Sequence, residues 1–262
     1  MATKAGVVQA VFPEGGLTRT GALQPAKLGL LSYMVSNFDP YGQRDIVFIP
    51  VGINYDRVLE DRVQLAAGKT AAGQPVRFKF SFGVFVRYNL RRLWQRINGT
   101  WHRYGYACVS FGRPISMKAL LEPRALDLRG LPPEERHAEI EAIGLRLMTA
   151  VGAVVPVVPV PLVATAFLEA QGQPLTLFEL KGRVFDLITT FEQAGAYVHV
   201  PRKDRDYAID AGLRMLVERQ LVVVKDDTFA AHADGVELLQ YYANSLVHLR
   251  RGATSTMQAV AE

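Results

Sequence analysis

Residues 45–51 have the sequence DIVFIPV, a run of apolar and mostly β-branched side chains that begins with a single acidic residue. This run predicts a β-strand, because β-branched side chains fit the pleated strand backbone. A strand that is apolar on both faces is typical of a parallel sheet that helices cover on both sides. The segment therefore predicts that the chain belongs to the α/β fold class.

Further strands and helices are predicted on both sides of this strand. Residues 6–12 and 104–111 are short apolar runs, and each ends at a turn rich in glycine and proline. Helices are expected where apolar residues recur at helical spacing, over 27–34, over 84–97 and from the proline pair at 132–133 to about 147.

The C-terminal part of the chain is predicted to be mostly helical, with one small hairpin. Asp234 is followed three residues later by Glu237, which predicts a capping box at the start of the last helix. The expected elements are helices over 176–194, 206–219 and 234–250 and a hairpin formed by 221–224 and 229–231. We therefore expect a partial α/β domain in 1–155, a helical region in 156–252 and a flexible tail in 253–262.

Composition favours a globular protein with a hydrophobic core. Of the 262 residues, 49% are hydrophobic and 21% are charged, which is an ordinary balance for a folded domain. Because Cys108 is the only cysteine, the chain has no internal disulfide and no cysteine-based zinc site. The five histidines lack metal-ligand spacing, so we expect neither a metal nor a cofactor. The net charge of +5 suits an anionic partner without distinguishing a phosphate ester, a lipid surface or a nucleic acid.

Residues 151–168 carry no charge and are long enough for a membrane-spanning helix. However, Pro156, Pro159 and Pro161 lie in the middle of this segment. A proline costs about 3 kcal/mol in a helix interior, because it removes a backbone donor and clashes with the preceding turn. The segment therefore predicts a buried, extended crossover that leads into a short helix.

The densest chemical motif is FPEGGLTRTG at residues 12–21. Its glycines allow backbone N–H groups to point at an anion. The guanidinium of Arg19 is able to hold a phosphate through two parallel hydrogen bonds. On spacing alone, an ordinary turn with an exposed arginine–glutamate pair explains the same residues.

This motif resembles the phosphate-binding motif of the glycerol-3-phosphate acyltransferases, in which a proline-glutamate-glycine block is followed by R-S-R-T-G-K. Four further segments are similar to segments of that family and occur in the same order, so that the resemblance extends from about residue 8 to about residue 250. They are DIVFIPVGINYDRVLE at 45–60, VSFGRPI at 109–115, VVPVPLVATAFL at 157–168 and LQYYANSLVHL at 239–249.

The resemblance implies a partial acyltransferase sheet with flanking helices, followed by a mostly helical region. It implies transfer of a fatty acyl group from acyl-CoA or acyl-carrier protein to glycerol 3-phosphate in phospholipid biosynthesis. Pro50 would line the acyl side. The residues that would surround the substrate phosphate are Glu14, Gly15, Gly16, Arg19, Thr20 and Gly21. The sequence departs from the common pattern at Leu17 and Ala22, where many members carry arginine and lysine, so another polyol phosphate or a lysophospholipid also fits as the acceptor.

The family's catalytic unit, His-x-x-x-x-Asp, precedes the phosphate motif, but only eleven residues precede Phe12 here and none is histidine. The histidine of that unit is a general base, which is typically worth roughly 10²- to 10⁴-fold in rate. One such string, from His199 to Asp204, lies far behind the motif and contains Pro201, so we expect a basic loop there and no catalytic dyad. We expect an acyltransferase truncated at its N-terminus or, alternatively, an inactive relative that acts as a partner subunit. A sheet without its first strands would expose apolar surface to such a partner.

Two further partner classes follow from charge. In the predicted helix over 84–97, Arg87, Arg91, Arg92 and Trp94 suit an anionic membrane surface, although packing on the sheet explains the same pattern. The lipid product of the family implies a cytoplasmic protein that is peripheral at the inner membrane face. The elements over 176–250 also suit a winged helix, but the helix over 206–219 mixes acidic and basic residues, so we expect no nucleic-acid partner.

Overall fold

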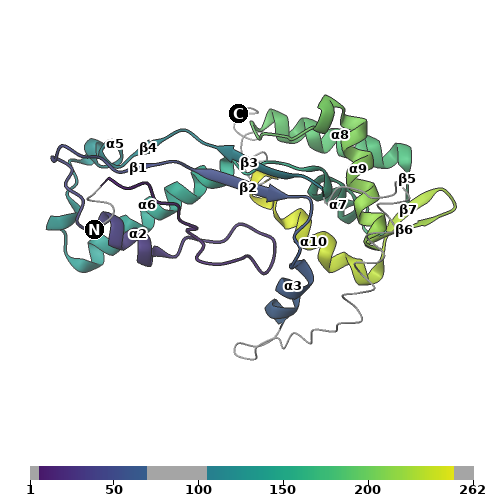
Figure 1. Cartoon of the computed structure of the whole chain (residues 1–262), viewed down its shortest axis with the longest axis horizontal. Helices are drawn as coiled ribbons and strands as arrows, with labels where there is room; N and C mark the ends of the chain where they lie inside the picture. Colours follow the sequence, from purple (N-terminus) through teal and green to yellow (C-terminus); the bar gives the residue numbers. More distant parts are fainter. Residues whose placement is uncertain (1–5, 70–104, 251–262) are drawn as a thin grey trace, which may run out of the picture.

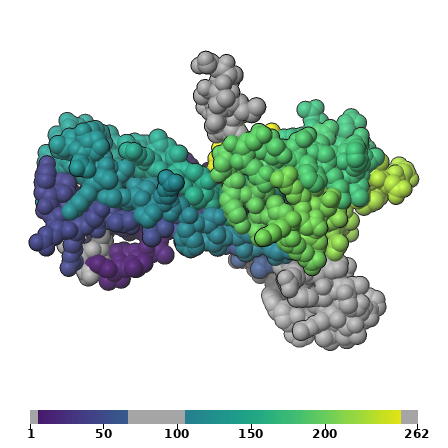
Figure 2. Space-filling model, turned by 90° about the horizontal axis from the view of Figure 1, so that it is seen from above, coloured from purple at the N-terminus to yellow at the C-terminus, as the bar shows by residue number. Residues whose placement is uncertain are grey.

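The computed structural model describes residues 6–69 and 105–250, which form two lobes joined by a narrower waist (Figures 1 and 2). Helices and strands are both present, which confirms the α/β class. The first lobe contains α2 (Leu28–Val35), β1 (Val47–Phe48), β4 (Ile115–Ser116), α5 (Met117–Leu121), the 3-10 turns η1 (Glu122–Arg124) and η2 (Leu128–Gly130), and most of α6 (Pro133–Ala153).

The second lobe is built from the C-terminal half of the chain, and β2 (Val51–Tyr55) and β3 (Ala107–Phe111) lie at the waist (Figure 1). The short helix α3 (Asp61–Lys69) follows β2 and packs against the last helix, α10 (Val236–Asn244). The elements of the second lobe are α7 (Pro159–Glu169), β5 (Leu175–Thr176), α8 (Leu177–Gln193), η3 (Pro201–Lys203), α9 (Arg205–Glu218), β6 (Val222–Lys225), β7 (Thr228–Ala231), η4 (Ala233–Gly235) and α10 (Val236–Asn244).

Two antiparallel segments, 47–55 and 107–116, form a ribbon that connects the lobes, with β1 paired to β4 and β2 paired to β3. Between the two paired stretches, the two residues 49–50 lie opposite the three residues 112–114, so the ribbon contains a one-residue bulge. The single buried strand of a parallel sheet predicted over 45–51 is therefore wrong. Pro50 has no N–H with which to continue the pairing, and the strand resumes beyond it as far as Tyr55.

Among the residues that the structure describes, only one face of this ribbon is covered. Gly52 packs so closely on α6 that a Cβ there would lie 2.3 Å from the Val154 carbonyl oxygen. Side chains on the opposite face remain between 36% and 72% exposed, and they are Val47, Ile49, Val51, Ile53, Tyr55, Val109 and Phe111. We name these seven residues the open ribbon face. The apolar character of both strand faces is thus real, but in the described residues only one face has a cover.

The N-terminal run at 6–12 was predicted to be a strand, and this prediction is wrong. These residues form no strand, and Val8 and Phe12 are 96% and 77% exposed. An apolar run becomes a strand only when a neighbouring segment accepts its backbone hydrogen bonds, and no such neighbour lies in residues 6–69 and 105–250.

Helix α7 is the centre of the second lobe. Nine of its eleven residues are buried, and it packs against α8, α9 and α10. Pro159 occupies its first position, where the missing N–H has no intrahelical partner to lose. The buried extended segment 155–158 precedes it, which confirms the predicted crossover into a short helix. Within the described ranges no helix is both long and apolar enough to cross a membrane.

The remaining helices mostly begin where the sequence predicted. Helix α8 starts with a capping box, because Thr176 accepts the N–H of Glu179 and the Glu179 carboxylate accepts the N–H of Thr176. The capping box predicted at Asp234 and Glu237 is wrong. The turn η4 shifts the start of α10 to Val236, and His232 Nδ1 accepts the N–H of Asp234 instead.

Each lobe has its own apolar core. The core of the first lobe is formed between α2, α5 and α6 by residues such as Val35, Met117 and Ile140. The second, larger core surrounds α7 and includes Phe167 and Phe191. We propose that the boundary between the two regions lies near residue 155, at the crossover between α6 and α7.

A buried carboxylate joins the ribbon to the second lobe. The Asp56 carboxylate accepts the N–H of Val160 in the first turn of α7 over 2.8 Å and the N–H of Tyr106 over 2.9 Å. Burial raises the pKa of Asp56 to about 6, although both N–H groups act in the opposite direction. This side chain thus satisfies backbone donors of two segments that are far apart in sequence.

We predict that Asp56→Ala lowers the free energy of unfolding by about 2–4 kcal/mol, since it leaves two buried N–H groups without an acceptor. Urea unfolding followed by circular dichroism measures this change. Glu60→Ala is the matched control, because Glu60 is exposed and lies four residues away, and it should change stability by less than about 0.5 kcal/mol. Equal effects of the two variants would contradict the structural role of Asp56.

The raised pKa of Asp56 gives this prediction a pH dependence. Between its ordinary value of 3.8 and about 6, the folded state binds more protons at this group than the unfolded state does. The contribution of Asp56 to stability is therefore greatest below pH 4 and is lost as the pH rises through 6. Relative to Asp56→Asn, the wild-type chain should lose stability between pH 4 and pH 7.

Candidate functional site

The motif at residues 12–21 lies in an irregular loop that two backbone hydrogen bonds close. The N–H of Gly15 donates to the Phe12 carbonyl over 3.0 Å, and the N–H of Lys27 donates to the Pro13 carbonyl over 2.8 Å. Gly15 has a φ of +68°, in the left-handed region that favours glycine. A glycine turn and a long-range backbone bond thus fix the base of this loop, and we name residues 13–27 the PEGG loop.

Short polar contacts fold the tip of the PEGG loop. The Thr18 hydroxyl donates to the Ala22 carbonyl over 2.9 Å, and the Gln24 amide donates to the same oxygen over 2.9 Å. The N–H of Thr20 lies 3.4 Å from the Thr18 hydroxyl oxygen. Arg19, between these threonines, is exposed, and its side chain has no hydrogen bond or ion pair within residues 6–69 and 105–250. Its guanidinium is thus available to an external anion.

The loop tip is docked on the C-terminal helix α10. Gly21, with a φ of +81°, lies so close that a Cβ there would be 1.8 Å from the Tyr241 carbonyl oxygen. The Asn244 amide donates to the Thr20 carbonyl over 2.7 Å. Because any side chain at position 21 would collide with helix backbone, the glycine of the T-R-T-G motif is required by packing as well as by its φ angle.

A third contact extends this docking to the end of α6. A Cβ at Gly152 would lie 3.2 Å from a methyl carbon of Leu23 and 3.1 Å from the His248 ring. His248 Nε2 lies 3.0 Å from the Gly152 carbonyl oxygen, which fits a proton on that nitrogen. Burial lowers the pKa of His248. Residues near both ends of the chain therefore meet at the PEGG loop.

Two charged side chains flank the glycine turn. Partial burial raises the pKa of Glu14, while the backbone N–H of Gln24 favours its ionised form. Lys27 lies across Gly15, where a Cβ would be 2.7 Å from the Lys27 Cδ and 3.4 Å from its Nζ. Within the described ranges this ammonium group has no hydrogen bond or ion pair. The sequence analysis missed Lys27, because only the backbone bond to Pro13 brings it back to the turn.

Pro50 is not part of this loop. It is buried at the ribbon bulge, where its carbonyl accepts the N–H of Gly112 and its ring packs against that glycine. The contacts described for Pro50 join the two ribbon segments. The structure therefore brings together Glu14, Gly15, Gly16, Arg19, Thr20 and Gly21 in one loop and leaves Pro50 in another element.

The end of β2 and the segment that follows it attach the ribbon to the second lobe through buried polar groups. The Asn54 amide donates to the Pro156 carbonyl over 2.9 Å. The Asp61 carboxylate accepts from the Tyr242 hydroxyl over 2.5 Å and pairs with Arg219 over 2.6 Å. Burial raises the pKa of Tyr242, with a smaller opposing effect from the Arg219 charge. Asn54, Asp56 and Asp61 of GINYDRVLED thus have structural partners in the C-terminal lobe.

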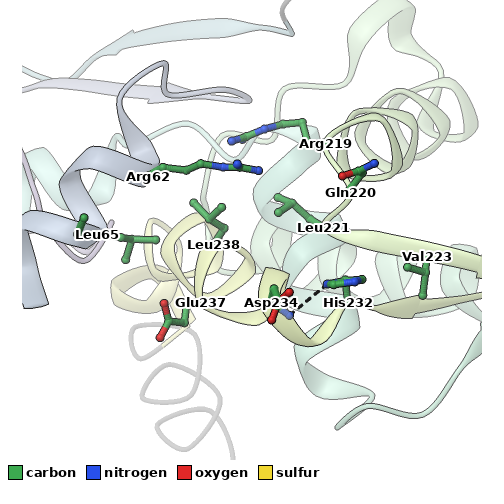
Figure 3. Close-up of a pocket in the computed structure, with 11 residues that line it drawn as sticks. Arg62, Leu65, Arg219, Gln220, Leu221, Val223, His232, Asp234, Glu237 and Leu238 are labelled. Carbon is green, nitrogen blue, oxygen red and sulfur yellow. Dashed lines mark hydrogen bonds between the residues drawn. The ribbon is translucent and has the colours of Figure 1, made fainter. Parts of the chain in front are cut away.

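Beside the Asp61 cluster, a cavity of about 680 Å³ opens between α3, the residues after α9, β6 and α10 (Figure 3). Arg62 and Arg219 extend toward one end of it, whereas Asp234 and Glu237 lie at the other. Equal numbers of acidic and basic side chains line the cavity, so its charge does not favour an anion. The residues of α10 that line the cavity belong to a different turn of the helix from the residues that contact the PEGG loop.

The string from His199 to Asp204 does not form a dyad. The His199 ring packs on Tyr106, with 5.1 Å between ring centroids, and burial lowers the pKa of His199. Asp204 instead caps α9 by accepting the N–H of Tyr207 over 3.0 Å. Pro201 starts the turn η3 between them, so the two side chains serve different elements.

Two other regions were considered for partner binding, a membrane contact at residues 87–94 and the C-terminal elements for nucleic acid. Arg87, Arg91, Arg92 and Trp94 lie outside the described residues. In the second lobe, the three strands lie in the order β5-β7-β6, together with α7, α8 and α9. On α9, Asp206 and Asp210 pair with Lys181, and Arg205 pairs with Glu192, so this helix carries both signs of charge. No group of metal-binding side chains occurs in residues 6–69 and 105–250.

Comparison with known proteins identifies relatives of this chain. Residues 92–250 match the family model described as glycerol-3-phosphate acyltransferase C-terminal region. Proteins named glycerol-3-phosphate acyltransferase are similar over 91% of the chain, with 28% identity for the protein of Pseudomonas syringae pv. syringae and 26% for that of Alteromonas mediterranea. The matched region makes up 28% and 29% of those proteins, respectively, so the chain spans less than a third of their length.

We predict that Gly21→Ala undocks the PEGG loop, because its Cβ would collide with the Tyr241 carbonyl and its φ is unfavourable by about 1–2 kcal/mol for a residue with a side chain. Hydrogen exchange of the amides in 18–24 should accelerate. Gly16→Ala is the control within the same motif, since a Cβ at Gly16 meets nothing within 4 Å. Unchanged exchange in Gly21→Ala would show that the loop does not depend on this contact.

Proposed function

Because the chain belongs to the family of glycerol-3-phosphate acyltransferase C-terminal regions, we propose that it takes part in acyl transfer to glycerol 3-phosphate. The fatty acyl donor is acyl-CoA or acyl-carrier protein. The observation that carries this proposal is the PEGG loop, which has Lys27 across its glycine turn and Arg19 near its tip, neither side chain paired with any residue of 6–69 or 105–250. A dianionic phosphate ester matches that charge and the backbone donors of such a turn.

Arg19 is the principal phosphate-binding residue of this proposal. Its planar guanidinium offers two parallel donors to phosphate oxygens, and it is held between two threonines whose positions the loop fixes. Glu14, Gly15, Gly16, Thr20 and Gly21 shape the loop. Glu14 supports it through the backbone N–H of Gln24, and Gly15 leaves room for the Lys27 side chain.

Lys27 supplies the second cation. The sequence has leucine at position 17 and alanine at position 22, so the PEGG loop carries fewer basic residues than the R-S-R-T-G-K pattern it resembles. The Lys27 ammonium supplies a positive charge in place of a missing basic residue, because its side chain lies along the glycine turn. This arrangement supports a phosphate ester as the acceptor.

The reaction needs a general base that these loop residues do not provide. In acyl transfer the acceptor hydroxyl attacks the thioester carbonyl, the hydroxyl proton goes to the base, and the thiol leaves. We propose that a His-x-x-x-x-Asp unit on polypeptide outside these 262 residues provides the base, and that this polypeptide packs on the open ribbon face. The seven exposed apolar side chains of this face support a protein partner. The edges of the strands also offer such a partner backbone hydrogen bonds. Pro50 lies in the same ribbon and would line the acyl side from there.

The alternative is an inactive relative that acts as a partner subunit. The open ribbon face favours a partner in this case too, and the two proposals differ in whether the assembled complex transfers an acyl group. We further propose that the protein is cytoplasmic and lies at the inner membrane face, where an acylated glycerol phosphate would enter the lipid. The basic residues at 87–92 and Trp94 remain the predicted contact with an anionic surface.

We predict that Arg19→Ala weakens the binding of glycerol 3-phosphate about 10- to 150-fold, which corresponds to a charged hydrogen bond of about 1.5–3 kcal/mol. Lys27→Ala should weaken it less, by roughly fivefold, because an exposed ion pair contributes up to about 1 kcal/mol. Isothermal titration calorimetry measures both. Arg183→Ala on α8 is the control for loss of an exposed arginine and should bind like the wild type. Binding that survives Arg19→Ala would refute this phosphate site.

We predict that the chain transfers no acyl group alone but gains activity with the portion of the Pseudomonas syringae relative that lies outside the matched region. Transfer to radiolabelled glycerol 3-phosphate reports activity, and co-elution in size-exclusion chromatography reports assembly. Phe111→Ser, at the most exposed position of the open ribbon face, should abolish both. Assembly without activity would favour the partner-subunit alternative, and activity of the isolated chain would refute the need for an external base.

A further inference from the structure

The position of Arg19 depends on the far end of the chain. Asn244 and Thr20 are 224 residues apart in sequence, yet the Asn244 amide donates to the Thr20 carbonyl over 2.7 Å. Thr20 directly follows Arg19. This bond therefore fixes the backbone next to the guanidinium that the proposed function assigns to the substrate phosphate.

The Asn244 side chain is itself held in one orientation. Its amide oxygen accepts a hydrogen bond from the Gln240 side chain, one turn earlier in α10, over 2.7 Å. With the oxygen occupied in this way, the amide nitrogen faces the loop. The donor is thus oriented before any ligand binds, and it does not depend on the loop for its direction.

Two packing contacts lie on either side of this bond. Gly21 rests against the backbone of Tyr241, and Tyr241 is only 5% exposed. Leu23 contacts the end of α6 at Gly152. In contrast, Gly16 at the other end of the motif has no neighbour within 4 Å of a Cβ position. The loop is therefore anchored on α6 and α10 on its C-terminal side, immediately after Arg19.

We propose that Asn244 is a positioning residue for phosphate binding, through which the C-terminal lobe sets the affinity of the PEGG loop. This inference rests on the proposed function of that loop. Asn244 contacts Thr20 and Gln240 and acts on the substrate only through the loop backbone. A loop that is already ordered loses less conformational entropy on binding, so the contact raises affinity without touching the ligand.

Asn244→Asp provides a nearly isosteric test. Aspartate still presents oxygen to Gln240 but cannot donate to the Thr20 carbonyl. Asn244→Ala removes the same donor without adding a charge. We expect both variants to bind glycerol 3-phosphate about three- to tenfold more weakly in calorimetry. Trypsin cleavage after Arg19, followed by mass spectrometry, should become several times faster in both, because the loop opens more often.

Gln193→Ala, at the exposed end of α8, is the control for loss of a polar helical side chain and should match the wild type in both assays. Asn244→Gln, which keeps an amide donor, should recover part of the binding and of the protection. The melting temperature of each variant separates loop undocking from global unfolding. Weaker binding with unchanged trypsin cleavage would overturn the positioning role.

The outcomes also separate this inference from the proposed function. If the wild type and Arg19→Ala both fail to bind glycerol 3-phosphate, the proposed function fails, while the cleavage assay still tests the contact between Asn244 and the loop. If Arg19→Ala loses binding but both Asn244 variants bind normally, the inference fails alone. If Asn244→Asp weakens binding and Asn244→Ala does not, repulsion by the new charge explains the result, and the inference is also overturned.

Discussion

The buried carboxylate of Asp56 is the interaction on which the arrangement of the two lobes depends. It accepts the N–H of Tyr106 from one side of the ribbon and the N–H of Val160 from the first turn of α7. The first N–H groups of a helix have no intrahelical partner. The start of α7 is buried inside the second lobe, so its free N–H groups need partners there. The Asp56 carboxylate accepts one of these N–H groups, that of Val160. The end of the ribbon is thereby held beside the start of α7.

This attachment determines where the rest of the chain is placed. Asn54 binds the Pro156 carbonyl just before α7, and Asp61 binds Tyr242 and Arg219 beyond it. Asn54 and Asp61 therefore hold the start of α7 and α10 in a fixed relation to the ribbon. The PEGG loop then contacts both helices, with Gly21 against α10 and Leu23 at the end of α6.

The N-terminal loop and the C-terminal lobe contribute differently to the proposed phosphate site. The cations that suit a phosphate ester come from the N-terminal loop, whereas the surfaces that order this loop come from the C-terminal lobe. The C-terminal lobe contacts this loop through α10, where the Asn244 amide donates to the Thr20 carbonyl. The open ribbon face has the opposite character, since its apolar side chains have no cover among the described residues.

The sequence by itself determined the elements whose signal is local. The spacing of apolar residues located α8 and α9, the prolines at 156–161 predicted the crossover and short helix, and the motif at 12–21 located the loop that carries Arg19. A local capping-box pattern did not by itself decide how a helix begins. The threonine and glutamate at 176 and 179 form a capping box, whereas Asp234 and Glu237 do not, because a 3-10 turn precedes α10.

Only the tertiary structure decided how these segments meet. An apolar strand has the same sequence whether its neighbour is parallel or antiparallel and whether one or both faces are covered, so the ribbon, its bulge and its open face were not predictable from residues 45–51. Lys27 and Asn244 entered the candidate site for the same reason. Their contacts with Gly15 and Thr20 join residues 12 and 224 positions apart, and no local periodicity records which distant backbone group a side chain will bind.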